Sequence, residues 1–72
     1  MTITIYTRHD CQACKLTKRA LQRRGLDYHE VNLDQEPERA AEVEARGHRS
    51  LPVVITDTDE WAGIDPARLR AL

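Results

Sequence analysis

The sequence predicts an α/β fold in which a four-stranded mixed sheet is flanked by helices, in the chain order β-α-β-α-β-β-α. Residues 1–7 alternate apolar and polar side chains and are rich in β-branched types, which is typical of a strand. A helical pattern separates this strand from the next one, and that connection requires parallel strands with a right-handed crossover. A short turn at residues 57–60 joins the last two strands, which requires an antiparallel hairpin.

The first half of the chain contains the strand at residues 1–7, a helix from about Gln12 to Arg24, and a second strand within residues 26–33. Gly25 follows the last periodic residue and is a good helix terminator. The helix has one apolar stripe at steps of three and four residues, made of Ala13, Leu16, Thr17, Ala20 and Leu21.

The second half begins with a helix that starts within residues 34–37 and ends at Gly47. Its apolar face is thin, so we expect loose packing that depends on tertiary contacts. Strands are expected at residues 51–56 and 61–62. Asp65 followed by proline is typical of an N-cap and the first residue of a final helix, with Leu69 and Leu72 facing inward.

Length and composition limit what the chain can be. The 72 residues allow one domain, residues 1–72, with a small core. The 32% of charged residues and the formal net charge of −1 argue against a general nucleic-acid binder. No apolar run reaches membrane-spanning length, and the N-terminus lacks a signal-peptide pattern. We therefore expect a monomer of the cytoplasm that binds neither nucleic acid nor membrane.

The strongest chemical signal is the C-x-x-C at residues 11–14, placed directly after the first strand and directly before the helical pattern. The first thiol then lies at a helix N-terminus, where unpaired backbone N–H groups and the helix dipole favour negative charge. Since the thiolate is the attacking species, this position lowers the pKa of the Cys11 thiol and makes it the better nucleophile. Cys14, one turn further along, is close enough to attack a mixed disulfide formed at Cys11.

Metal binding is the main alternative for this cysteine pair. Two cysteines so close together do not staple a loop, and in a reducing compartment they indicate catalysis or metal binding. Zinc requires four ligands, and no second C-x-x-C exists. Apart from carboxylates, the only further candidates are His9, His29 and His48. We therefore favour redox chemistry and expect no metal, with a zinc or iron–sulfur module as the less favoured hypothesis.

Three separated motifs point to a family. Tyr6-Thr7 precedes the C-x-x-C, an x-Pro-Val-Val strand lies at Leu51 to Val54, and Trp61-Ala62-Gly63 follows downstream. Together they span essentially the whole chain and resemble the NrdH-type redoxins, small glutaredoxin-like proteins of the thioredoxin superfamily. The resemblance implies a thioredoxin/glutaredoxin-like fold and a thiol–disulfide oxidoreductase without a bound cofactor. It also implies electrons from NADPH through thioredoxin reductase, and the large subunit of a class Ib ribonucleotide reductase as acceptor.

The same resemblance assigns roles to individual residues. Cys11 would be the attacking thiol and Cys14 the resolving one. Pro52 would be a cis-proline whose loop lies beside the active sulfur. Because this proline lacks an N–H, the backbone groups of Leu51 would be free to pair with a substrate chain.

One departure from the family pattern makes a second reductant a candidate. The family usually carries Trp-Ser-Gly-Phe-Arg-Pro, whereas this chain has Ile64 and Asp65 in place of Phe and Arg. Gly63-Ile64-Asp65 is closer to the Gly-x-Asp with which typical glutaredoxins hold the amino end of glutathione. In those proteins a basic residue near the position of Arg8 also meets a glutathione carboxylate. A glutathione-coupled glutaredoxin is therefore the alternative, although Asp65 has a sufficient structural role as an N-cap.

Two groups of side chains have both a structural and a functional interpretation. Trp61 either fills a core that is poor in aromatic residues or lies partly exposed and helps to dock a partner. Arg8, Lys15 and Lys18 either belong to a solvated surface or surround the first thiol with positive charge. The sequence alone leaves both alternatives open.

Overall fold

A single four-stranded sheet forms the centre of the structure, a computed structural model that describes all residues 1–72. Its strand order is β2-β1-β3-β4, with β1 parallel to β2 and the other two pairings antiparallel. This confirms the predicted element order and the hairpin. The elements are β1 (Thr4–Thr7), α1 (Gln12–Arg23), β2 (His29–Asn32), the 3₁₀ turn η1 (Pro37–Arg39), α2 (Ala40–Ala45), β3 (Val53–Ile55), β4 (Glu60–Ala62) and α3 (Pro66–Ala71).

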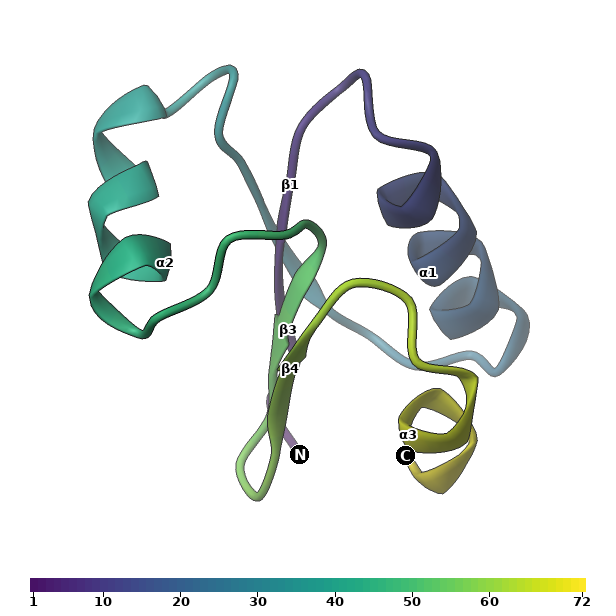
Figure 1. Ribbon diagram of the computed structural model, residues 1–72. Coiled ribbons are helices and arrows are strands. Elements are labelled where there is room, and N and C mark those ends of the chain that lie inside the picture. Colours follow the sequence, from purple (N-terminus) through teal and green to yellow (C-terminus); the bar gives the residue numbers. More distant parts are fainter.

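Helices cover both faces of the sheet, which is seen edge-on in Figure 1, with α1 and α3 on one side and α2 on the other. The alternation of side chains along each strand divides the core accordingly. Beneath α1 and α3 lie six buried residues, namely Ile3, Ile5, Leu21, Val54, Trp61 and Leu69. Beneath α2 lie five, namely Tyr6, Val31, Leu33, Val43 and Val53. Nine of these eleven residues are aliphatic, and each group contains one aromatic residue, Trp61 or Tyr6.

The regular elements are shorter than the sequence patterns. Strand β1 begins at Thr4 rather than at residue 1, and β2 occupies only His29–Asn32 of the expected residues 26–33. Strand β3 occupies only the middle of residues 51–56. A strand ends where the neighbouring strand no longer pairs with it, and the β-propensity of its residues does not predict that position. The second helix is a 3₁₀ turn followed by six α-helical residues, and Val43 is its only buried side chain.

Helix α1 ends where the sequence predicted, and its apolar stripe needs one correction. Gly25 has φ +67°, a conformation that L side chains rarely adopt, and it follows the C-cap residue Arg24. The side chains that α1 buries are Cys14, Thr17 and Leu21. Leu16, expected on the inward stripe, is 39% exposed. These three buried residues define the inward face of α1. Because successive residues are rotated by about 100° around the helix axis, the Leu16 side chain points away from that face.

Candidate functional site

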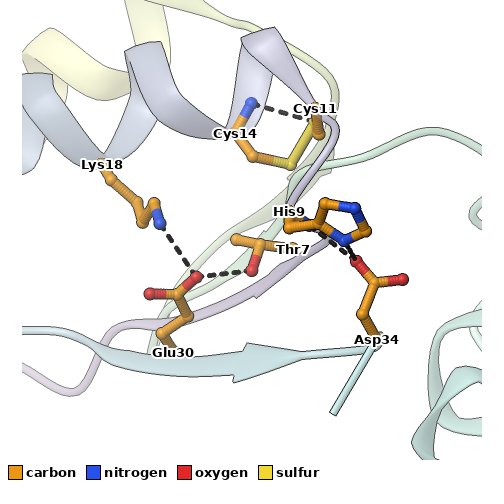
Figure 2. The surroundings of a disulfide bond; sticks show 7 residues. All are labelled: Thr7, His9, Cys11, Cys14, Lys18, Glu30 and Asp34. Carbon is orange, nitrogen blue, oxygen red and sulfur yellow. Dashed lines mark hydrogen bonds and ion pairs between the residues drawn. A yellow bond between two sulfur atoms is a disulfide. The ribbon is translucent and has the colours of Figure 1, made fainter. Parts of the chain in front are cut away.

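The cysteine pair lies where β1 leads into α1. Cys11 is the N-cap of the helix, with an extended backbone, and its Sγ accepts a hydrogen bond from the Cys14 N–H at 3.1 Å. The two cysteines form a disulfide with a Cα–Cα distance of 5.2 Å (Figure 2). Cys14 is fully buried, whereas Cys11 is partly exposed. A thiol at the first position is therefore reachable from outside, whereas the second sulfur is covered by the protein.

The loop before β3 lies at the same end of the sheet. The Leu51–Pro52 peptide bond is cis, which confirms the prediction for Pro52. Val53 pairs with Tyr6 in antiparallel register, so Pro52 lies next to the C-terminal end of β1. From that end the chain continues to Cys11. Neither the N–H nor the C=O of Leu51 makes a hydrogen bond within the chain. These two backbone groups therefore have no partner within the chain, and their pairing with a substrate chain stays a prediction.

A shallow hollow lies between this loop, Arg8 and α2. Its volume is about 130 Å³, and Arg8, Ser50 and Leu51 are among the residues that line it. Arg8 also donates a hydrogen bond from Nη1 to Asp34 Oδ1 at 3.2 Å. The positive charge expected from Arg8 near the thiol is therefore partly neutralised by a carboxylate that the sequence analysis did not single out.

Asp34 holds the loop between β1 and α1. Its Oδ2 accepts a hydrogen bond from the His9 backbone N–H at 2.7 Å and pairs with Nδ1 of the His9 ring. The hydrogen bond from the His9 backbone is the largest of the effects that lower the pKa of Asp34 below its ordinary value. Asp34 follows β2, and β1 and β2 end together because Thr7 pairs with Asn32. The parallel register is the signal that could have found this contact.

A second carboxylate lies on the Cys14 side of the disulfide (Figure 2). Glu30 Oε2 accepts hydrogen bonds from Thr7 Oγ1 at 2.6 Å and from Lys18 Nζ at 3.0 Å. Burial raises the pKa of Glu30, but the hydrogen bonds from Thr7 and Lys18 outweigh it and the net shift is downward. The Lys18 ammonium is therefore paired with Glu30. The hypothesis that it lies beside the thiol receives no support.

The remaining predicted residues fall into two places. Gly63 donates its N–H to the Pro52 carbonyl at 2.8 Å, so the segment after β4 is tied to the cis-proline loop. Asp65 is the N-cap of α3, and its Oδ1 accepts from the Arg68 N–H at 3.1 Å, which confirms its structural role. Trp61 is only 4% exposed and belongs to the core under α1 and α3. Its interpretation as an exposed docking residue is wrong, because the aromatic-poor core takes up the indole.

The site contains no cluster of ligands for a metal. Nowhere in the chain do three histidine, cysteine, aspartate or glutamate side chains gather so that they could hold an ion. His48, one of the candidate ligands, is largely buried and pairs through Nε2 with Glu60 at 2.6 Å. None of the helices combines the length and the apolar content needed to cross a lipid bilayer.

Comparisons with known proteins agree with this geometry. Residues 3–61 match the glutaredoxin family model. The whole chain is 47% identical to the glutaredoxin-like protein NrdH of Escherichia coli K12, of which it covers 89%. It is 31% identical over 70 residues to NrdH of Lactococcus lactis subsp. cremoris, covering 97% of each chain.

Among solved structures, the NrdH-redoxin of Escherichia coli superposes with a TM-score of 0.94, over 100% of this chain and 95% of that one. The predicted thioredoxin/glutaredoxin-like fold is thereby confirmed. Two findings identify the chain: it has a redox-active cysteine pair on this fold, and it is similar over its full length to the NrdH sequence and the NrdH-redoxin structure of Escherichia coli. It belongs to the glutaredoxin family as an NrdH-type redoxin, and it is a thiol–disulfide oxidoreductase.

Proposed function

We propose that this redoxin is a dithiol electron donor for a protein disulfide, with Cys11 as the attacking thiol and Cys14 as the resolving one. The single observation that carries the proposal is the contrast between a partly exposed Cys11 at the N-cap and a Cys14 that is 0% exposed. The Cys11 thiolate attacks one sulfur of the partner disulfide, and the other partner sulfur leaves. Cys14 then attacks the mixed disulfide, so that the partner departs fully reduced and the Cys11–Cys14 bond closes.

The partner that the family suggests is the large subunit of a class Ib ribonucleotide reductase, with re-reduction by thioredoxin reductase and NADPH. The similarity to an NrdH-redoxin described by its thioredoxin-like activity profile supports this reductant. The free backbone groups of Leu51 support an extended protein segment as substrate, because such a segment can add to them as a strand. The protein itself needs no bound cofactor in this cycle.

Glutathione is the second candidate reductant, and Gly63-Ile64-Asp65 is the observation that favours it. In this structure the Asp65 carboxylate is engaged in capping α3 through Oδ1. Asp65→Asn retains a capping oxygen and removes the charge that would meet an ammonium group. Loss of glutathione-dependent turnover in this variant, with stability unchanged, would favour the glutaredoxin alternative.

The mechanism is tested with Cys14→Ser, which keeps the attacking thiol and removes the resolving one. The reduced variant is mixed with an oxidised disulfide partner, and covalent adducts are mapped by mass spectrometry under non-reducing conditions. We expect a stable mixed disulfide through Cys11, released by dithiothreitol. The matched control, Cys11→Ser, should form little or none. Absence of an adduct through Cys11 would overturn the mechanism.

The reductant is tested in parallel with the wild-type protein. Oxidised redoxin is incubated with thioredoxin reductase and NADPH, or with glutathione, glutathione reductase and NADPH, and NADPH consumption is followed. We expect turnover with thioredoxin reductase. Turnover with the glutathione system and none with thioredoxin reductase would show that glutathione is the reductant.

A further inference from the structure

The loop before Cys11 holds a histidine whose ring is fixed at one nitrogen and open at the other. His9 lies two residues before the proposed attacking thiol. Its Nδ1 pairs with Asp34, and its side chain is 76% exposed. Figure 2 shows the imidazole on the Cys11 side of the disulfide, with its second nitrogen directed away from Asp34. Nothing in the chain occupies that second nitrogen, Nε2.

We propose that His9 is the proton donor to the partner sulfur that leaves when Cys11 attacks, and that Asp34 positions His9 for this step. This inference rests on the proposed dithiol mechanism and adds a catalytic residue to it. In that step the bond between the two partner sulfurs breaks and a bond from Cys11 to one of them forms. The electron pair goes to the leaving sulfur, which takes the proton from His9 Nε2. Water then reprotonates the exposed ring.

The contacts of Asp34 suit it to this positioning role. One carboxylate oxygen, Oδ2, holds both the backbone N–H and the ring of His9, so the ring is fixed relative to the chain that leads to Cys11. The other oxygen, Oδ1, accepts from Arg8. Asp34 is itself fixed at its backbone, where its N–H donates to Asn32 Oδ1 at 2.8 Å. When both ring nitrogens carry a proton, Nδ1–H donates to Asp34 and Nε2–H is left for an acceptor outside the chain.

A donor is useful here because the leaving sulfur carries the negative charge produced by the attack. Thiolates that are strong bases leave slowly, and a nearby acid stabilises them most. Lys15 is a further cation close in sequence, but its side chain makes no hydrogen bond or ion pair within the chain. The charged or titratable groups around the loop come from five segments, and they are Arg8, Asp10, Lys15, Asp34, Glu44, His48 and Arg49. Of these groups, Asp34 is the one that pairs with the His9 ring.

The test compares two disulfides that differ in the basicity of the leaving sulfur. Reduced redoxin is mixed in a stopped-flow instrument with bis(2-hydroxyethyl) disulfide, whose alkyl thiolate is strongly basic, or with dithionitrobenzoate, whose aromatic thiolate is weakly basic. For His9→Asn we expect the rate with the alkyl disulfide to fall about tenfold. The rate with dithionitrobenzoate should change less than about twofold, because that sulfur leaves without help.

Two further variants complete the comparison. Asp34→Asn should shift the ratio of the two rates in the same direction as His9→Asn. His29→Asn is the matched control, since His29 is an exposed histidine at the start of β2 and its side chain has no partner; both of its rates should equal those of the wild type. Equal losses with both disulfides in His9→Asn, or no loss with either, would overturn the inference. A wild-type protein that reduces neither disulfide would instead refute the proposed dithiol mechanism, and this inference with it.

Discussion

The sulfur of Cys11 accepts a hydrogen bond from the backbone N–H of Cys14 at 3.1 Å. This contact is possible because Cys11 is the N-cap of α1, so that its side chain meets an N–H that has no partner within the helix. The same N–H would stabilise negative charge on the sulfur once the disulfide is reduced. The local backbone at the start of the helix therefore distinguishes two cysteines that are only three residues apart.

The stability of the first turn of α3 depends on its N-cap, Asp65. Asp65→Ala removes the acceptor for the Arg68 N–H, and we expect a loss of about 1 kcal/mol in the free energy of unfolding. Urea denaturation followed by circular dichroism measures it. Asp27→Ala is a suitable control, because Asp27 is exposed and makes no hydrogen bond, so its free energy of unfolding should change by less than about 0.5 kcal/mol. Equal losses in both variants would show that the cap contributes nothing.

The core under α1 and α3 depends on Ile5, which is 0% exposed in the central strand β1. Ile5→Ala should lower the free energy of unfolding by about 2–5 kcal/mol, through lost burial and the cavity left behind. That is a large share of the stability of a 72-residue chain. Leu16→Ala removes a similar side chain from the 39% exposed position, and we expect a change within about 0.5 kcal/mol. A large loss of unfolding free energy in Leu16→Ala would show that Leu16 packs on the inward face, as its sequence pattern predicted.

The carboxylate of Glu30 makes stability depend on pH in a defined direction. Its pKa is lowered from 4.5 in the folded protein, so the unfolded chain binds more protons in this range and stability rises with pH. The stabilisation is fully present above about pH 4.5 and is lost as the pH falls through the lower folded value. The free energy of unfolding of wild type and Glu30→Gln should therefore differ more at pH 7 than at pH 3. A difference that does not vary with pH would mean that Glu30 is not stabilised as an anion.

Much of the fold was predictable because it depends on local chemistry. The strand β1, the helix stop at Gly25 and the cap at Asp65 each follow from a few neighbouring residues, and the structure contains all three. The limits of the strands were not predictable in the same way. They depend on which residues of a distant segment pair with them, as His29 does with Thr4. The cis bond before Pro52 was expected from the family resemblance and not from the residues themselves.

The surroundings of the site could be predicted only in part. The cysteine pair and its place at a helix start follow from the spacing of the sequence. The pairs His9–Asp34 and Thr7–Glu30 join residues 25 and 23 positions apart, and they exist because β1 and β2 lie in parallel register. Single-sequence patterns predict that two strands are parallel without giving their register. Trp61 was undecided for a related reason, since only the packed core shows whether the indole is covered.

The measurement that tests the central claim most directly is competitive alkylation of the fully reduced protein. Limiting iodoacetamide is added at about pH 6, where ordinary thiols are protonated, and the modified cysteine is identified by peptide mapping. If the start of α1 favours a thiolate at the exposed position, the label is found on Cys11 and Cys14 is spared. Equal labelling of the two cysteines, at the slow rate of an ordinary thiol, would contradict the account.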